Sequence, residues 1–259
     1  MAAIDGAAVC PHGAHPGDHC VPDLLADHHL DQSSGRDRDR AALATPGVAL
    51  AFANSIVVAV ASTILTTFLG SLAAYALAKT YLSFAFRQGL LVWILVTRIF
   101  PPVTTAIPYY VIIKNLQLGD THLALILTYV AYGLPFVIWL MLGFFQDLPA
   151  EIEKAAIVDG CSLWQRFQQV ILPLALPGLA VTSVFAFIYS WNELLYASIL
   201  TSFNAKTIPV VVAGFISDQF LRWGEMTAIG SIMIIPVLLF AAGAQRYLVR
   251  GLTFGAVKG

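Results

Sequence analysis

From residue 48 onward the chain consists of long apolar stretches separated by short polar breaks, and this pattern decides what it can fold into. A helix needs about 20 apolar residues to cross about 30 Å of hydrocarbon, and five stretches reach that length. These stretches cover residues 52–78, 89–113, 122–145, 174–202 and 228–249. In lipid every backbone amide needs an internal partner, and an alternating ten-residue strand pattern is absent. The sequence therefore predicts an all-α, polytopic transmembrane helical bundle in a lipid bilayer.

The overall composition excludes two broad classes of protein. Apolar residues make up 58% of the chain and charged residues only 11%, which excludes a water-soluble globule. Lys and Arg number 14 against 15 Asp and Glu, so there is no basic excess of the kind that neutralises nucleic-acid phosphates. The three cysteines are too few and too scattered for a disulfide framework or a four-ligand zinc site. We expect no nucleic-acid partner and no metal.

Residues 1–47 belong to a different compositional class from the rest of the chain. They hold ten charged residues and five of the six histidines, and no apolar run long enough for a membrane span or a signal-peptide core. A metal-binding arm is one interpretation, but the His and Asp spacings fit no compact ligand motif. We therefore expect 1–47 to be an atypical, polar, disordered segment and 48–259 to be the transmembrane domain.

Several predicted spans contain prolines, namely Pro101, Pro102 and Pro108 in the second, Pro135 in the third and Pro236 in the fifth. Proline removes a backbone donor and kinks a helix. Such a break is tolerated at membrane depth where protein or a water-filled cavity satisfies the freed carbonyl groups. The prolines therefore favour the interior of a transporter over a simple membrane anchor.

The distribution of Lys and Arg predicts the orientation, because positive residues in short loops stay preferentially on the cytoplasmic side. If loop 146–173 is cytoplasmic, three positive residues lie outside, and these are Lys114, Lys206 and Arg222. Seven then lie on the inner side, and these are Lys79, Arg87, Lys154, Arg166, Arg246, Arg250 and Lys258. The bias predicts a cytoplasmic loop and a cytoplasmic C-terminus.

The polar loop between the third and fourth spans begins with the features of a short helix. Pro149 suits an early helical position, while Glu151 and Glu153 suit the positive end of a helix dipole. These residues predict a surface helix over 149–158.

The same loop continues through a turn into a second helix. Gly160 favours the left-handed conformation that stops a helix. Trp164, Phe167 and Val170 then recur at i, i+3 and i+6, and Pro173 marks re-entry into the membrane. The prediction is a helix, a turn and a second helix on the cytoplasmic face.

The spacing of this loop resembles a known signature, that of inner-membrane permease subunits of ATP-binding-cassette (ABC) importers of the maltose-type carbohydrate permease family. That signature runs Glu-Ala-Ala, three residues, Gly, nine residues, Ile, any residue, Leu-Pro. The aligned positions here are Lys154, Ala155, Ala156, Gly160, Val170, Leu172 and Pro173. Lys154 stands where the family has glutamate, with Glu153 one residue earlier, and Val170 is a conservative replacement of Ile.

The resemblance extends from about residue 51 to the end of the chain. It includes FANS (52–55), TRIFPPV (97–103), SWNELLYA (190–197) and RGLTFGAVKG (250–259). It implies the type I ABC importer permease fold in a bacterial or archaeal inner membrane, with 146–173 as the coupling loop. Relatives usually have a sixth, N-terminal span, which residues 1–47 do not offer. An altered start, a truncated family member or an upstream frame error would explain the five apparent spans.

The resemblance also implies the partners. The short helix of the coupling loop is expected to dock on a separate cytoplasmic ABC ATPase dimer through Ala155, Ala156, Asp159 and Gly160, with Glu153 as a substitute for the missing glutamate. A second homologous permease, an extracytoplasmic solute-binding protein and a sugar substrate complete the system. The chain contains no G-x-x-x-x-G-K-[ST] phosphate loop. We therefore expect a transport subunit rather than an enzyme, binding no cofactor, with ATP used by the partner subunits.

Ionisable residues inside membrane spans are costly and mark candidate functional sites. Arg98 lies near the middle of the second span and Glu193 within the fourth. We expect these two to pair or to gate rather than to contact solute. Sugars are recognised by aromatic faces and by amide groups, so Tyr189, Trp191 and Asn192 are a candidate translocation surface, with helix packing as the alternative.

Three other functions remain open on the sequence. An ABC permease for another polar solute, such as a glycerol phosphate, has the same expected architecture. An ion-coupled secondary transporter or channel would move solute without an ATPase, but the paired halves of an inverted repeat are not evident. A nonconducting scaffold would leave uptake unchanged when Arg98 or Glu193 is altered.

Overall fold

The computed structural model describes residues 47–79, 83–215 and 223–255, and all regular structure in those residues is helical. The predicted all-α bundle is therefore confirmed. The predicted disordered segment lies outside the described residues apart from its last position. The helices are α2 (Val48–Lys79), α3 (Phe84–Ile99), α4 (Pro102–Asn115), α5 (His122–Asp147), α6 (Ala150–Val158), α7 (Leu163–Gln165), the π-helix η1 (Arg166–Ile171), α8 (Leu172–Leu174), α9 (Leu176–Trp191), α10 (Leu195–Leu200), α11 (Ile208–Ala213) and α12 (Trp223–Gly255).

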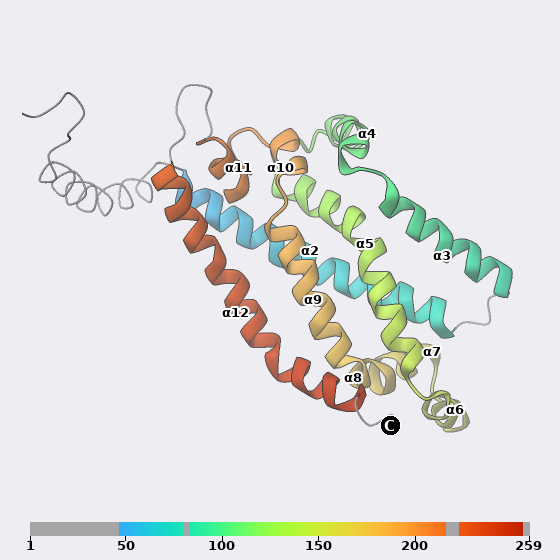
Figure 1. Ribbon diagram of the computed structural model, residues 1–259. Coiled ribbons are helices and arrows are strands. Elements are labelled where there is room, and N and C mark those ends of the chain that lie inside the picture. The colour runs from blue at the N-terminus through green and yellow to red at the C-terminus, as the bar shows by residue number, and fades with distance from the viewer. Residues whose placement is uncertain (1–46, 80–82, 216–222, 256–259) are drawn as a thin grey trace, which may run out of the picture.

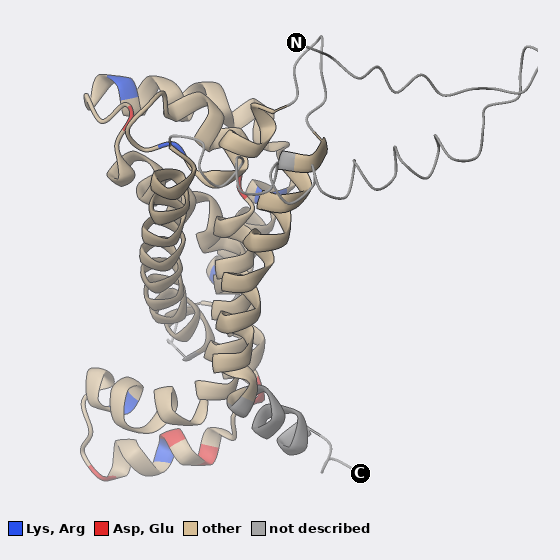
Figure 2. Cartoon of the chain, turned by 90° about the vertical axis from the view of Figure 1, so that its left-hand side faces the viewer, with Lys and Arg blue, Asp and Glu red and all other residues tan. Residues whose placement is uncertain are grey.

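Helices α2, α5 and α9 form the centre of the bundle, with α3 on one flank and α12 on the other (Figure 1). Helices α4, α10 and α11 gather at one end, which we call the α4 end. Helices α6, α7 and α8 lie at the opposite end, the α6 end, where α12 also finishes. Charged residues are found mostly at these two ends (Figure 2). A wide apolar middle between two charged ends is the arrangement that a lipid bilayer requires.

Three of the five predicted spans form single long helices. The candidate spans Val48–Ala78, His122–Asp147 and Met226–Gln245 are each long and apolar enough to cross a bilayer. Two bent helix pairs raise the number to five when each pair is counted as one span. The first pair bends by 96° between α3 and α4, and the second by 79° between the segment Leu163–Leu174 and α9.

The break in the second predicted span lies at Pro101 and Pro102, where α3 ends and α4 begins. At the start of α4, Thr104 Oγ1 donates to Pro101 O at 2.7 Å and Thr105 Oγ1 donates to Pro102 O at 2.9 Å, so both hydroxyl groups bond to their own helix. The other prolines do not break their helices. Pro108, Pro135 and Pro236 lie inside α4, α5 and α12.

The fourth predicted span, 174–202, is longer than the helix that forms there. Helix α9 ends at Trp191, and residues 195–200 form the separate short helix α10. The Glu193 carboxylate accepts hydrogen bonds from the backbone N–H groups of Tyr196 at 3.0 Å and Ala197 at 3.2 Å. A side chain that caps a new helix start in this way competes with continuation of the preceding helix.

The most extensive helix contact joins α2 to α5. A Cβ atom placed on Gly70 would lie 2.5 Å from Val137 Cγ1, so only glycine permits this approach. Around it, α2, α5, α9 and η1 share one core cluster that includes Ala74, Met141 and Phe145. Small residues at helix interfaces provide close van der Waals packing where lipid supplies no hydrophobic driving force.

The α4 end is stabilised by a carboxylate that the sequence did not single out. Asp120 accepts backbone N–H bonds from Ser202, Phe203, Asn204 and Ala205, at 2.9 to 3.3 Å. Partial burial opposes ionisation, but these backbone donors hold the pKa of the Asp120 carboxyl at about 2. Its own backbone is left-handed, with φ at +58°, a conformation that Asp tolerates better than most residues.

Helix α2 is fastened to the same loop. Asn54 Nδ2 donates to the carbonyl oxygens of Asn204 and Lys206 at 2.9 and 3.0 Å. The Asn54 amide oxygen pairs with His122 Nε2 at 2.8 Å, and Ser55 Oγ accepts the N–H of Ile208 at 2.8 Å. The polar N-terminal residues of α2 therefore fix α5 and the 204–208 segment relative to each other.

Replacing Gly70 by leucine is expected to destabilise the bundle. The larger side chain collides with Val137, so α2 and α5 must separate, and overpacking of this kind costs about 1–3 kcal/mol. The thermal midpoint of the detergent-solubilised protein measures the effect. Gly143→Leu is the control, because nothing lies within 4 Å of a Cβ at that position of α5. Equal midpoints for the two variants would contradict the assigned contact.

Replacing Asp120 by asparagine is expected to lower the thermal midpoint by a few degrees at neutral pH. Because the folded pKa lies below the unfolded value of 3.8, ionised Asp120 contributes its full stabilisation above about pH 4. That contribution is lost as the pH falls towards about 2. The difference in midpoint between wild type and Asp120→Asn should shrink over this interval. A difference that stays constant as the pH falls would show that the carboxylate charge is not what holds the loop.

Candidate functional site

The predicted surface helix of the loop is α6, and its end has the predicted geometry. Gly160 has φ at +79°, which confirms the left-handed stop. The N–H of Gly160 donates to Ile157 O and the N–H of Cys161 donates to Ala156 O, each at 3.0 Å. This pair of bonds is a Schellman motif, which satisfies the last carbonyl groups of a helix while the chain turns away.

The second half of the loop starts with a capping box at Ser162. Its Oγ accepts the N–H of Gln165 at 3.3 Å, and the Gln165 side chain accepts the N–H of Ser162 at 2.8 Å. The chain then passes into a π-helical turn, η1, which widens the helix. The predicted i, i+3 face is consequently only partly correct. Phe167 is buried, but the next buried position is Ile171, and Trp164 is exposed.

Large apolar side chains lie exposed on the outer side of this loop. We call the group Ile157, Val158, Leu163 and Trp164 the docking face, and their exposed fractions run from 45% for Ile157 to 87% for Val158. The face lies at the charged α6 end of the molecule rather than along the apolar middle (Figures 1 and 2). Exposed apolar groups within a polar region mark a protein contact better than they mark a lipid contact.

The predicted coupling residues fall on both sides of α6. Lys154, Ala155, Asp159 and Gly160 are exposed and lie with the docking face. Ala156 is only 6% exposed, so it faces the bundle, and its contact with a partner stays a prediction. Of the last two coupling residues, Leu172 is half-buried and Pro173 is exposed.

Glu153 also faces inward. Its Oε1 accepts a hydrogen bond from Tyr75 Oη of α2 at 2.9 Å and lies 3.5 Å from Arg166 Nη1 of η1. The carboxylate is therefore not oriented to replace the glutamate that the family has at position 154. Nothing in the sequence spacing points to Tyr75 as its partner, because the two residues are 78 positions apart.

Arg98 lies in a cage of aromatic rings at the end of α3. Its guanidinium carbon lies 5.1 Å from the ring centre of Tyr132, 5.5 Å from that of Phe136 and 5.6 Å from that of Tyr189. Its Nη1 also donates to Tyr132 O at 3.5 Å. The ring faces attract the cation and replace part of its hydration.

The predicted ion pair between Arg98 and Glu193 is not formed in the described part of the chain. Each buried charge is compensated by groups close to it. Aromatic faces surround the arginine, and backbone N–H groups at the start of α10 bind the glutamate. The Glu193 carboxylate can cap α10 without approaching a distant arginine, and this is why the expected ion pair does not form.

The three predicted pathway residues of α9 separate in the structure. Trp191 is 2% exposed, donates from Nε1 to Met233 O at 3.0 Å and stacks on Phe187, so it is a packing residue here. Tyr189 is half-buried within the Arg98 cage, and Asn192 is exposed. Of the three, only Tyr189 and Asn192 keep exposed surface in this conformation.

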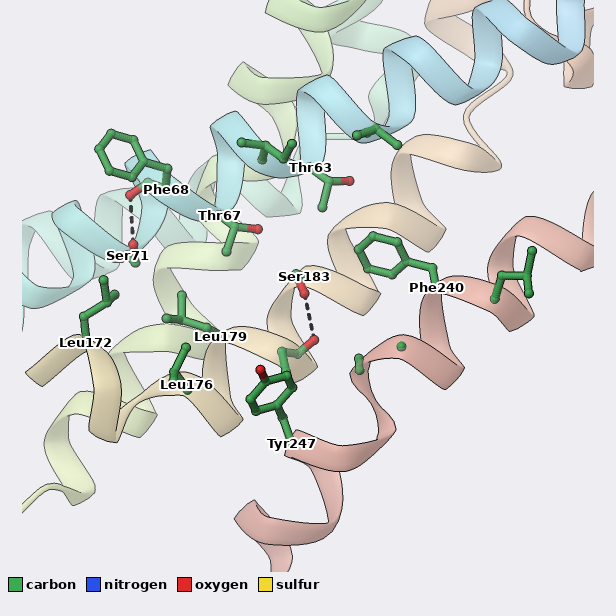
Figure 3. A pocket seen from close by; sticks show the side chains of 16 residues that line it. Thr63, Thr67, Phe68, Ser71, Leu172, Leu176, Leu179, Ser183, Phe240 and Tyr247 are labelled. Carbon is green, nitrogen blue, oxygen red and sulfur yellow. Dashed lines mark hydrogen bonds between the residues drawn. The ribbon is translucent and has the colours of Figure 1, made fainter. Parts of the chain in front are cut away.

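A groove of about 700 Å³ lies between α2, the start of α9 and α12 (Figure 3). Its walls are mainly apolar, with a row of hydroxyl groups from Thr63, Thr67 and Ser71 at four-residue intervals along α2. Ser71 Oγ donates to its own helix, whereas Thr63 Oγ1 and Thr67 Oγ1 are buried without a hydrogen-bond partner within the described residues. The groove has no charged lining residue, and it is separate from the Arg98 cage.

Candidate metal ligands do not cluster in the part of the chain that the structure describes. Within residues 47–79, 83–215 and 223–255, no three His, Cys, Asp or Glu side chains come together as a metal site would require. The histidines of the predicted metal-binding arm lie outside those residues.

Comparison with known protein families gives a match over most of the chain. Residues 66–254 match the family described as binding-protein-dependent transport system inner membrane component. A probable ABC transporter permease protein, y4oR of Sinorhizobium fredii, is 43% identical over 206 residues, which are 79% of this chain and 73% of that protein. The trehalose transport system permease protein SugB of Mycobacterium tuberculosis is 40% identical over 212 residues, covering 81% and 77%.

Two solved structures share the fold. A bacterial ABC transporter involved in import of the acidic polysaccharide alginate aligns with a TM-score of 0.67 and 25% identity over 81% of this chain and 78% of that one. The inward-facing methionine transporter MetNI aligns with a TM-score of 0.62 over 79% and 94%, and at 16% identity it supports the fold alone. The chain therefore belongs to the inner membrane components of binding-protein-dependent transport systems, the permease subunits of ABC importers.

Proposed function

We propose that this chain is the permease subunit of an ATP-driven carbohydrate importer and forms half of the solute pathway together with a second homologous permease. Relatives named for sugar transport support the substrate class. They include the trehalose permease described above, a trehalose/maltose permease of Thermococcus litoralis at 35% identity over 208 residues, and a diacetylchitobiose permease of Streptomyces coelicolor at 35% over 207. The bacterial or archaeal inner membrane is the proposed location.

The observation that carries the ATPase partnership is the docking face. Four large apolar side chains on a short, rigidly capped segment need a protein partner in water, and the segment presents them with exposed Lys154 and Asp159 beside them. A cytoplasmic ATPase dimer that hydrolyses ATP supplies that partner in our proposal. The α6 end, with the end of α12, then faces the cytoplasm, as the Lys and Arg distribution predicts.

The α4 end then faces the solute-binding protein. Asp120 and Asn54 hold the 202–206 loop rigidly there, so that this surface is preformed for a partner. A preformed surface avoids the ordering cost of binding. Solute delivered at this end passes between the two permeases when the bundles rock against each other.

Arg98 is the proposed gating residue on this route. The cation is held within the bundle by aromatic faces, beside half-buried Tyr189 of α9 and next to the 96° bend between α3 and α4. Movement at this bend would change how the guanidinium lies on its rings. Gating by Arg98 is therefore coupled to the geometry of a broken helix rather than to an ion pair.

An ABC permease for another polar solute is the second candidate. One relative supports it: the osmoprotective compounds uptake permease protein GgtD of Synechocystis is 36% identical over 219 residues. Uptake competition between disaccharides and small osmolytes separates the two candidates.

Changing Val158 to glutamate is expected to weaken binding of the partner ATPase by about tenfold or more, because it places a charge in the centre of a desolvated contact. The measurement is co-purification of the ATPase with the permease pair. Phe203→Glu is the matched control, since Phe203 is 82% exposed but lies at the α4 end. Loss of ATPase from both variants, or from neither, would contradict the assignment of the docking face.

Changing Arg98 to leucine is expected to reduce solute uptake by about tenfold while leaving the ATPase bound, because an intramembrane cation serves function more than assembly. Lys114→Leu is the control, as Lys114 is an exposed cation on α4 with a single aromatic neighbour, Tyr110. Uptake in proteoliposomes is compared at equal ATPase content. Normal uptake by Arg98→Leu would refute the gating role and favour a packing role for the cage.

A further inference from the structure

The inward-facing carboxylate of Glu153 joins three separate elements at one oxygen atom. Oε1 of Glu153, on α6, accepts the Tyr75 hydroxyl of α2 at 2.9 Å and lies 3.5 Å from Arg166 Nη1 of η1. Tyr75 is 3% exposed and Glu153 is 9% exposed. A buried, charge-assisted contact of this kind is strong and directional, unlike a surface ion pair.

The Tyr75 ring is also held by packing. Its centre lies 5.8 Å from the ring of Phe145 on α5 and 5.2 Å from the ring of Phe167 on η1. Both phenylalanines are buried in the same core cluster as Tyr75. The phenol therefore cannot follow a displacement of α6 by turning its side chain alone, because the two packed rings hinder that rotation.

Helix α2 continues from this point to the other end of the molecule. Tyr75 lies near the C-terminus of α2, and Asn54 lies near its N-terminus, where it holds the carbonyl groups of Asn204 and Lys206. Helix α6 itself packs chiefly on η1. The Tyr75 hydroxyl is thus a direct polar link between α6 and a helix that reaches the opposite end of the bundle.

We propose that Tyr75 is a positioning residue that transmits displacement of α6 into α2, with the Glu153 carboxylate as the joint and Arg166 as its counter-charge. This proposal rests on the proposed function, because α6 must first be displaced by a docked ATPase. It explains why a carboxylate lies on the inner side of a surface helix whose outer side carries the docking face. Tyr75 itself does not belong to the docking face.

The test uses the complete importer in proteoliposomes, with the second permease, the ATPase and the binding protein present. Tyr75→Phe removes one hydroxyl group and keeps the ring. We expect it to retain the ATPase and ATP hydrolysis but to lower the solute transported per ATP by about tenfold, within the range of measured coupling energies. Tyr110→Phe is the matched control, because Tyr110 is 41% exposed on α4 and far from α6.

Glu153→Gln is the second variant, since it keeps the size of the side chain and removes the charge. We expect a fall in solute per ATP here too, because the neutral amide loses its attraction to Arg166 and the charge assistance of the Tyr75 bond. The loss in the Tyr75→Phe, Glu153→Gln double variant should be less than additive, because both changes weaken one joint. A merely structural role would lower the yield of assembled complex and leave the ratio of solute to ATP unchanged.

Three results would overturn the inference. These are an unchanged ratio in Tyr75→Phe, additive losses in the double variant, and failure of both single variants to assemble, since a joint that only transmits motion is not needed for assembly. If the wild-type chain itself binds no ATPase, the proposed function fails, and that outcome is seen before any variant is compared.

Discussion

Helix α2 lies against α5 along much of its length because Gly70 leaves room for Val137, and the bundle is arranged around this contact. In lipid, apolar side chains gain little by leaving one apolar environment for another, so close shape fit must supply the association energy. The α2–α5 pair, joined by α9, provides that fit. The broken helices α3 and α4 and the lightly packed α12 lie outside it, where bending and displacement disturb the core least.

The two ends attached to this core differ in their physical character. At the α4 end, Asp120 and Asn54 satisfy nearly a whole loop of backbone donors and acceptors, which makes the loop rigid. At the α6 end, the capped α6–α7 segment presents apolar groups outward and attaches inward through Glu153. In the proposed function the α4 end receives the solute, the ATPase drives the α6 end, and helix α2 joins the two.

Local features of the sequence predicted most of the fold. The length of each apolar stretch identified α2, α5 and α12, the prolines at 101 and 102 located one break, and Gly160 gave the end of α6. These predictions succeeded because each depends on lipid thickness or on the backbone chemistry of one residue. The 96° angle at the break was not predictable, because neighbouring helices set it.

Features that depend on distant partners were missed or mistaken. Tyr75 and Glu153 meet across 78 positions, and no spacing rule connects them. The rule that buried charges attract each other predicts an Arg98–Glu193 pair as one of two roles, yet aromatic rings surround the arginine and the start of α10 binds the glutamate. The chemistry of Trp191 suits both a sugar contact and helix packing, and only tertiary structure shows that it packs in this conformation.

One measurement tests directly whether this bundle moves solute only when a separate ATPase acts on its docking face. The purified permease is reconstituted in vesicles alone and, in parallel, with its second permease, ATPase and binding protein, and solute uptake is followed with and without ATP and with imposed ion gradients. We expect no uptake by the chain alone under any gradient, and uptake by the full set only when ATP is hydrolysed. Uptake by the chain alone, driven by an ion gradient, would contradict this expectation.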